Sequence, residues 1–356
     1  MAELRPSGRP QLVLGLASLA LVAVVVLAAC ANGLLTGSDV FGQQASRQAP
    51  TRLQSGTSSA ASAMFAATPS ATPAAGQTTP SLPAMLAAIG DSYSQAYDVS
   101  PALPAHQDNV AYSWVLGTAK GDGIYSLRER FEALGASLTV VDAATSGEKM
   151  ADAVRQANLV VAAAQQLPQG ATVYVTFELG ANDVCDDPKT DPTLFLEQLR
   201  AAVAVLADGL PPGSRVLMLS VPDFDHLRSI TQANPASKAY FATPQYSHRC
   251  APFLGSNAQT PLSQASAILA SYDKSLVSEC DEIEATYGRS GRLHCISNGP
   301  GLAERDFDVA DLSGVDYFHP SYSGQAKMAK AAWKLGDWGM VPLPAEETAS
   351  IEEYSR

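Results

Sequence analysis

Five short apolar runs divide the second part of the chain, and each run ends in a polar loop. Short apolar runs bounded by turn residues are typical of buried strands. The loops read Gly-Asp-Ser, Ala-Thr-Ser-Gly, Gly-Ala-Asn-Asp, Pro-Asp-Phe and Asn-Gly-Pro-Gly. The predicted strands are Met85 to Ile89, Leu138 to Asp142, Thr172 to Leu179, Arg215 to Val221 and Leu293 to Ser297.

Apolar residues recur at helical spacing in the segments between these runs. The predicted helices are Lys149 to Gln166, Thr193 to Leu210, Leu262 to Tyr287 and Ser323 to Trp338. Strands that alternate with helices predict an α/β fold of three layers, with helices on both faces of a flavodoxin-like parallel sheet of about five strands. In such a sheet the loops at the carboxyl ends of the strands meet along one edge, so the polar loops are expected to lie together.

The amino end has the pattern of an export signal. Arg5 and Arg9 precede an uncharged stretch from Leu12 to Ala29, which is typical of a secretory signal peptide. The segment Leu27-Ala28-Ala29-Cys30 resembles the bacterial lipobox, in which the cysteine receives a lipid before cleavage. We therefore expect a signal peptide over residues 1–29 and a lipidated Cys30 that anchors the chain to the outer face of the cell membrane. An uncleaved transmembrane anchor is the alternative, because the stretch is long enough to span a bilayer.

Composition divides the rest of the chain. Residues 30–83 are rich in Ala, Ser, Thr, Pro, Gln and Gly and lack an apolar period, so we predict a disordered linker after the lipidated cysteine. A coil of this length has an end-to-end distance of about 40 Å, which limits how far the domain stands from the lipid. One folded domain is expected over residues 84–340, followed by a loose polar tail over residues 341–356.

The charge of the chain argues against nucleic acid as a partner. Its 356 residues include 35 acidic and 23 basic side chains, which give a formal net charge of -12. Binding to phosphates needs a basic face, so we do not expect binding to nucleic acid. An acidic body gains no attraction to anionic lipid either, so any contact with a membrane should depend on the amino-terminal anchor. We expect the domain to be a monomer.

Two polar segments carry the residue types of nucleophilic catalysis. Ser92 follows the first predicted strand in Gly90-Asp91-Ser92, where its hydroxyl can be exposed at a sharp turn. Asp316 precedes His319 by three residues, and a carboxylate at this spacing can orient one imidazole nitrogen while the other faces a nucleophile. Ser94 occupies the position of the last glycine of a G-x-S-x-G motif, which argues against an ordinary α/β-hydrolase. Taken singly, each segment is also compatible with a plain turn.

Two further loops offer hydrogen-bond donors for a developing oxyanion. The Asn182 amide follows the third predicted strand, and the Gly147 backbone N–H follows the second. A helix cap or Asx-turn is the alternative for Asn182-Asp183, and a simple turn is the alternative for Gly147. All four features nevertheless fall at strand ends in one chain order, and this arrangement points to acyl transfer.

These segments resemble the sequence blocks of the SGNH (GDSL-like) hydrolase superfamily over about Met85 to Trp338. GDSYS, the Gly147 loop, GAND and DYFHP are similar to its blocks I, II, III and V. The resemblance implies that Ser92 is the nucleophile, His319 its base and Asp316 the group that orients the base. It also implies an oxyanion hole made by Ser92, Gly147 and Asn182.

Finer features resemble the phospholipase B-like branch of the superfamily. They are Tyr112-Ser113-Trp114, Asn182-Asp183-Val184-Cys185 and Phe318-His319-Pro320-Ser321-Tyr322-Ser323-Gly324. Two departures are Tyr93, where a leucine or isoleucine is common, and Ala181 in place of a glycine. We expect Tyr93 to narrow the site, and we expect Trp114 to pack in the core.

The resemblance implies a serine esterase that cleaves acyl esters through an acyl-enzyme and needs no metal or cofactor. A lipid or phospholipid ester is the favoured substrate. An O-acyl ester of a carbohydrate, or acyl transfer to a second acceptor, is the alternative within the same fold. An inactive surface binding protein is the alternative from another class. The remaining histidines are interpreted as surface or packing residues: His106, His226, His248 and His294.

Four cysteines remain when Cys30 is set aside, and an even number in an exported chain indicates two disulfides. Four cysteines allow three pairings, and their spacing does not decide among them. We favour Cys280 with Cys295, which ties a helix to the following strand, and Cys185 with Cys250, which ties the loop of Asn182 to a long insertion. Zinc is the alternative, but the chain has no C-x-x-C pair, so we expect no metal site.

Overall fold

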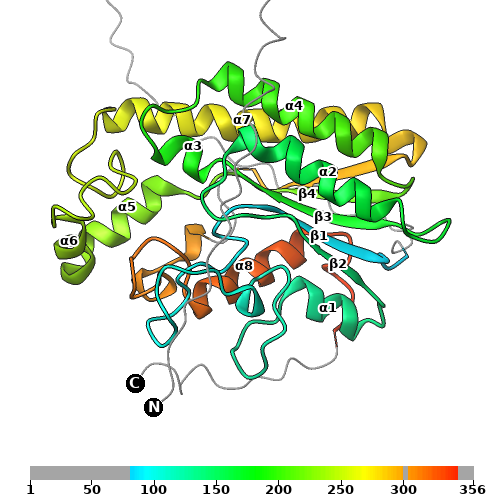
Figure 1. The fold of residues 1–356 in the computed structure, drawn as a ribbon, viewed down its shortest axis with the longest axis horizontal. Coiled ribbons are helices and arrows are strands. Elements are labelled where there is room, and N and C mark those ends of the chain that lie inside the picture. Colours follow the sequence, from blue (N-terminus) through cyan, green and yellow to red (C-terminus); the bar gives the residue numbers. More distant parts are fainter. Residues whose placement is uncertain (1–80, 300–303, 344–356) are drawn as a thin grey trace, which may run out of the picture. The chain divides into compact units, whose positions relative to one another are not determined.

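The computed structural model describes residues 81–299 and 304–343. Five strands and the helices between them form a parallel sheet with helices on both faces (Figure 1). The predicted three-layer α/β fold is therefore confirmed. The predicted signal peptide, Cys30, nearly all of the linker and most of the carboxyl-terminal tail lie outside the described residues.

The sheet has the strand order β2-β1-β3-β4-β5, and all of its neighbours are parallel. Its strands are β1 (Met85–Gly90), β2 (Thr139–Asp142), β3 (Val173–Glu178), β4 (Ser214–Met218) and β5 (Leu293–Ser297). The central strands β1 and β3 are buried along their whole length, as expected for strands covered by helices on both faces. The chain order reverses between β1 and β3, and this switch point is where sheets of this kind bind ligands.

Two groups of helices cover the sheet. Figure 1 shows α2 (Ala153–Ala164), α4 (Pro192–Gly209) and α7 (Leu262–Thr286) over one face. It shows α1 (Leu127–Ala133) and α8 (Tyr322–Leu335) over the other face. The side chain of Asp191 caps α4, because it accepts the N–H groups of Thr193 and Leu194. Short 3₁₀ turns complete the described part at Val110–Tyr112, Met150–Asp152, Gly288–Ser290, Glu304–Asp306 and Val309–Asp311.

Helices that the apolar pattern did not predict lie in the long connections. They are α1, α3 (Ala181–Cys185), α5 (Phe224–Ala233) and α6 (Pro235–Phe241). Asn234 begins α6 by accepting the N–H groups of Ala236 and Ser237. Residues 222–261, which we call the α5–α6 lobe, lie at the end of the sheet where α5 and α6 are labelled in Figure 1.

Two predicted elements each end three residues earlier than expected. Strand β4 stops at Met218 instead of Val221, because the N–H of Val221 donates to the Asp273 carboxylate (3.0 Å) and not to a neighbouring strand. The last helix stops at Leu335 instead of Trp338, because Gly336 is extended. Trp338 instead packs edge-on against Phe131.

The core extends slightly beyond the predicted domain ends. Leu82, Val341 and Leu343 pack, partly buried, against the apolar core. Trp114 is fully buried in that core, as predicted. Within residues 81–299 and 304–343, no helix combines the length and the apolar character that a membrane crossing requires.

Candidate active site

The turn after β1 places Ser92 at the carboxyl edge of the sheet. Gly90 ends the strand, and a Cβ at this position would lie 2.3 Å from Ser94 Oγ, so the close turn requires glycine. Gln156 on α2 fixes the same point, since its Oε1 accepts the Gly90 N–H (2.7 Å) and its Nε2 donates to the Gly90 carbonyl (2.9 Å). The end of β1 that precedes Ser92 is therefore fixed by hydrogen bonds to both the N–H and the carbonyl of Gly90.

Two buried acids lie under this turn. Asp91 Oδ1 accepts the Tyr93 N–H at 3.1 Å, so Asp91 stabilises the turn. Glu178, at the end of β3, accepts from Ser94 Oγ at 2.5 Å. Burial raises the pKa of Asp91 and of Glu178, and the negative charge of Asp91 raises that of Glu178 further. The pair therefore retains protons to a higher pH than exposed carboxyl groups do.

The loop before α8 carries the other two predicted catalytic residues. Its shape depends on Tyr317, which lies between them with a left-handed φ of 52°. The Ser313 N–H donates to the His319 carbonyl at 2.7 Å, and Leu312 bridges to Pro320. These bonds close the loop on itself and fix the direction of His319.

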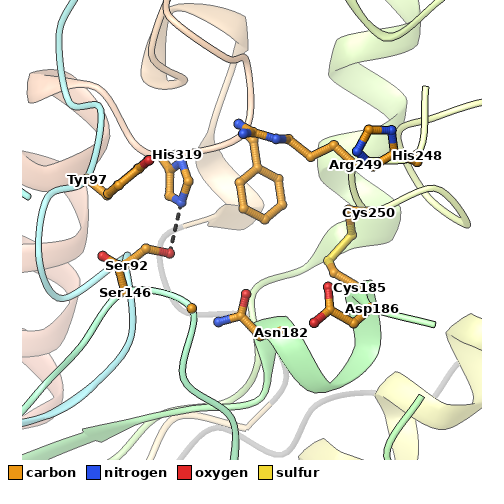
Figure 2. A pocket seen from close by; sticks show the side chains of 12 residues that line it. Ser92, Tyr97, Ser146, Asn182, Cys185, Asp186, His248, Arg249, Cys250 and His319 are labelled. Carbon is orange, nitrogen blue, oxygen red and sulfur yellow. Dashed lines mark hydrogen bonds between the residues drawn. A yellow bond between two sulfur atoms is a disulfide. The ribbon is translucent and has the colours of Figure 1, made fainter. Parts of the chain in front are cut away.

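Ser92, His319 and Asp316 form one hydrogen-bonded chain. His319 Nε2 lies 2.8 Å from Ser92 Oγ (Figure 2), and His319 Nδ1 lies 2.6 Å from Asp316 Oδ2. An ionised carboxylate can only accept, so Nδ1 carries the hydrogen and Nε2 is free to accept from the serine. This is the arrangement of a nucleophile, its base and the residue that orients the base.

The Asp316 carboxylate is fully buried and has four donors. Its Oδ1 accepts the backbone N–H groups of Phe318 (3.0 Å) and His319 (3.1 Å). Its Oδ2 accepts from His319 Nδ1 and from Arg249 Nη1, the latter at 2.8 Å. Burial by itself would raise the pKa of Asp316, but the charge and hydrogen bonds of His319, together with Arg249, hold that pKa below its ordinary value. Asp316 is therefore held in its ionised form.

The two predicted oxyanion donors lie beside Ser92. Gly147 has a φ of 86°, which only glycine adopts readily, and it lines the same cavity as Ser92. Asn182 lies in the first turn of α3, so the predicted loop position is a short helix. Its Nδ2 donates to the Glu148 carbonyl (2.9 Å) and approaches Asp91 Oδ2 (3.3 Å). To bind an oxyanion, the Asn182 amide must break its longer hydrogen bond to Asp91 and donate to the substrate oxygen instead.

Residues next to Asn182 fix the position of α3. Gly180 has a φ of 128°, and a Cβ there would lie 2.6 Å from Val221 Cγ2, so the turn into α3 requires glycine. Asp183 Oδ2 accepts the Met150 N–H at 2.9 Å, and Asp183 Oδ1 accepts from Thr190 Oγ1 at 2.6 Å. Asp183 thus links α3 to the segment that follows Gly147, so the two predicted oxyanion donors are held together.

A cavity of about 400 Å³ opens over Ser92. Polar and apolar groups share its lining, which is formed by Ser92, Tyr97, Ser146, Gly147, Asn182, Cys185, Asp186, His248, Arg249, Cys250, Phe318 and His319. Figure 2 shows these side chains around the space between Ser92 and the α5–α6 lobe. The cavity lies at the small end of the range typical of small-molecule sites.

One sequence interpretation about this cavity is wrong. His248 is exposed, as expected for a surface residue, and it also lines the cavity. Tyr93 does not line it, because its side chain is fully buried and its hydroxyl donates to the Phe318 carbonyl at 3.0 Å. Tyr93 therefore supports the loop of His319 from below and does not narrow the site.

Two disulfides form with the favoured pairing. Cys185 bonds to Cys250 and Cys280 bonds to Cys295. The first bond joins the end of α3 to the α5–α6 lobe and lines the cavity. The second ties α7 to β5, away from the cavity.

Among the residues that the structure describes, one group of acidic and imidazole side chains has the spacing of metal ligands. Ligand atoms of Asp98, Asp316 and His319 lie within 4.8 Å of one another. His319 Nδ1 and Asp316 Oδ2 are hydrogen-bonded to each other, and Arg249 occupies the same carboxylate oxygen. These atoms are therefore committed to orienting the imidazole, which does not fit a cation site.

Comparison with known proteins identifies a family whose sequence model matches this chain. The model of GDSL-like lipases and acylhydrolases matches residues 86–332. No curated protein is similar enough to the chain to match it.

Several solved structures are similar in fold at low sequence identity. TesA is 17% identical with a TM-score of 0.39, over 70% of this chain and 97% of TesA. The psychrotrophic esterase EstA from Pseudoalteromonas sp. is 17% identical with a TM-score of 0.38, over 71% and 96% of the two chains. LAE5, an α/β hydrolase from the metagenome of Lake Arreo in Spain, is 18% identical with a TM-score of 0.42, over 73% and 96%. The family match spans most of the folded part and includes Ser92, Asn182 and His319, and on that match the chain belongs to the GDSL-like lipase/acylhydrolase family of SGNH hydrolases.

Proposed function

We propose that this chain is a serine esterase that hydrolyses carboxylic esters through an acyl-enzyme. The observation that carries the proposal is the hydrogen-bonded chain of Ser92, His319 and Asp316 beside a cavity lined by Gly147 and Asn182. Membership of a lipase and acylhydrolase family supports the same chemistry.

The reaction has two halves. Ser92 Oγ attacks the ester carbonyl carbon while its proton passes to His319 Nε2, and the carbonyl oxygen takes up the negative charge. The bond from carbon to the alcohol oxygen then breaks, and Nε2 returns the proton to the departing oxygen. Water repeats these steps on the acyl-enzyme, which releases the acid and restores Ser92. Asp316 stabilises the imidazolium in both halves.

For the substrate we propose a lipid or phospholipid ester. The resemblance of Tyr112-Ser113-Trp114 and of the His319 segment to the phospholipase B-like branch supports this choice. We also propose that Cys30 carries a lipid and holds the domain at the outer face of the cell membrane, next to such esters.

An O-acyl ester of a carbohydrate is the second candidate, and the polar side chains in the cavity wall favour it. Ser146, Asp186, His248 and Arg249 can hydrogen-bond to a polar alcohol. The apolar part of the wall includes Phe318, the ring of Tyr97 and the disulfide of Cys185 with Cys250. A short acyl group would contact the apolar part of the wall, and the polar alcohol of the same ester would contact the polar side chains.

An activity screen tests the mechanism and the substrate separately. The wild type is assayed on p-nitrophenyl esters of increasing acyl length, on lysophospholipid and on acetylated xylan. Ser92→Ala and His319→Ala should each remove nearly all turnover, and the double variant should be scarcely worse, because the two residues act as one unit. Ser278→Ala, an exposed serine on α7, is the matched control. Hydrolysis that survives Ser92→Ala would reject the mechanism, and deacetylation of xylan without action on lipids would reject only the lipid substrate.

The anchor has its own measurement. Intact-mass analysis of the membrane-extracted protein should find a chain that begins at Cys30 and carries acyl groups. Cys30→Ala should leave the precursor uncleaved. A mature wild-type chain that still contains residues 1–29 would reject the lipoprotein proposal in favour of an uncleaved anchor.

A further inference from the structure

Arg249 contacts the proposed catalytic machinery from outside the family motifs. Its Nη1 donates to Asp316 Oδ2 at 2.8 Å, and this is the same oxygen that accepts from His319 Nδ1. The Asp316 side chain is fully buried, whereas the Arg249 side chain is 28% exposed at the cavity wall. Arg249 thus reaches from the α5–α6 lobe to a buried carboxylate on another part of the chain.

The backbone of Arg249 is held by the neighbouring disulfide. Cys250 follows Arg249 and is bonded to Cys185, the last residue of α3. Cys250 has a left-handed φ of 41°, which a non-glycine residue adopts only when its surroundings enforce it. Figure 2 shows the disulfide below Arg249 and the guanidinium extending toward His319. The bond therefore couples the position of Arg249 to the helix that carries Asn182.

Aromatic contacts join the lobe to the loop of His319 at a second point. The Arg249 guanidinium lies 5.8 Å from the Tyr246 ring centre, and Tyr246 stacks on Tyr240 at 4.1 Å. Tyr240 contacts the ring of Tyr317 edge-on at 5.6 Å. Tyr317 lies between Asp316 and His319, so the lobe supports the motif loop on both sides of the carboxylate.

The charge of Arg249 also acts on the hydrogen-bonded chain. It helps to keep the buried Asp316 carboxylate ionised, since a buried carboxylate without a charge partner tends to take up a proton.

We propose that Arg249 is a positioning residue for the Asp316–His319 pair and that the disulfide of Cys185 with Cys250 holds it in place. The inference rests on the proposed esterase function, because it concerns turnover at Ser92. It predicts that catalysis depends on a residue and a disulfide of the α5–α6 lobe.

The first test replaces the guanidinium in the full-length protein. Arg249→Met should lower kcat about 10- to 100-fold, as expected when a catalytic group loses its orientation, and should change KM much less. Arg249→Lys should recover part of the loss, because it keeps the charge but not the planar donor. Arg200→Met is the matched control, since Arg200 pairs with Glu279 on α7, away from the cavity. Near-ultraviolet circular dichroism verifies that each variant is folded.

The pH profile distinguishes positioning from a loss of structure. The groups that face His319 besides Arg249 are Asp316, Asp91, Asp98, Tyr93 and Tyr97, and all of them remain in the variants. Arg249 is among the groups that lower the pKa of Asp316, so loss of its charge should raise that pKa and move the acid limb of kcat/KM to higher pH in Arg249→Met and much less in Arg249→Lys. A partly unfolded enzyme would have a lower kcat/KM at every pH without this shift of the acid limb.

The second test removes one disulfide at a time. Cys185→Ser with Cys250→Ser should lower kcat and shift the acid limb as Arg249→Met does. Cys280→Ser with Cys295→Ser is the matched pair, and it should keep the wild-type profile at a temperature where the protein is folded. If the first pair fails to fold, the Arg249 variants still test the role of Arg249, and reduction of the Cys185–Cys250 bond in the folded wild type tests the disulfide: unchanged kinetics after reduction would reject its role.

The outcomes separate the two proposals. A wild type without esterase activity, or one whose activity survives Ser92→Ala, rejects the proposed function. A Ser92-dependent wild type with unchanged kcat and an unchanged acid limb in Arg249→Met rejects the role of Arg249. A folded Cys185→Ser, Cys250→Ser variant with wild-type kinetics rejects the role of the disulfide.

Discussion

Asp273 on α7 allows a quantitative test of the structure that is independent of catalysis. Its side chain is buried, and its Oδ1 accepts the Val221 N–H at 3.0 Å, at the point where the chain leaves β4. Burial is the main cause that raises the pKa of Asp273 from 3.8 to about 7, with the nearby acids Asp223 and Glu304 adding to it. The folded protein therefore keeps a proton on Asp273 that the unfolded chain has lost.

The sign of the pH effect follows from this raised pKa. The stabilisation from the bound proton is complete below the unfolded pKa and disappears as the pH rises through the folded pKa. Between about pH 5 and about pH 8 the loss is roughly 2 to 3 kcal/mol, since each pKa unit corresponds to about 1.4 kcal/mol. For a domain of this size, that is a difference of roughly 5 to 10 °C in Tm.

Asp273→Asn removes the ionisation and keeps the side-chain oxygen that accepts from Val221. The free energy of unfolding of the wild type should fall relative to that of the variant as the pH is raised from about 5 to about 8, by roughly the amount above. Urea unfolding at constant ionic strength measures it, and Asp281→Asn, an exposed aspartate on the same helix, is the control. A difference between wild type and Asp273→Asn that is the same at both pH values would refute the reasoning.

Two further predictions concern the oxyanion site and the second disulfide. Asn182→Ala should lower kcat about 10²- to 10³-fold, because it removes one donor to the oxyanion, while the remaining turnover still depends on Ser92. Steady-state assays of Asn182→Ala and of Asn182→Ala with Ser92→Ala measure this. An unchanged kcat would contradict the role of Asn182 as an oxyanion donor. Removal of the Cys280–Cys295 bond, which joins cysteines with a sequence separation of 15, should lower the free energy of unfolding by about 3 kcal/mol. Unfolding in denaturant measures this change. Both cysteines should resist thiol labelling in the unreduced unfolded protein, and labelling of either one would contradict the bond.

The sheet was predictable from the sequence because burial on both faces produces continuous apolar runs. β1 and β3 illustrate this, since every residue of both strands is buried and each strand was predicted to within one or two residues. α3 and α6 were not predicted, because they are too short to show an apolar period and depend on caps and on contacts made after folding. Asn182 was accordingly expected in a loop and lies in the first turn of α3.

The predicted catalytic residues lie together because each follows a strand or a closed loop at one edge of the sheet. For the residues next to them in the chain, position in the sequence did not predict whether the side chain lines the cavity. Tyr93 is adjacent to Ser92, yet its side chain points into the core, since the sharp turn that exposes the serine directs the next residue away from the cavity.

Arg249 and His248 show the opposite case. They belong to a lobe with no recognisable motif and lie 67 residues or more before Asp316 along the chain, as the Arg249–Asp316 contact shows. Only the disulfide of Cys185 with Cys250 connects that lobe to the site in the sequence, and the favoured pairing was a hint that residues next to Cys250 reach the cavity. Spacing alone does not reveal such contacts, because a long insertion can fold back in many ways. The cysteine pairing was thus the strongest signal in the sequence for a contribution of the insertion to the site, and it points to the flank of Cys250 as the place where substitutions should change turnover without touching a family motif.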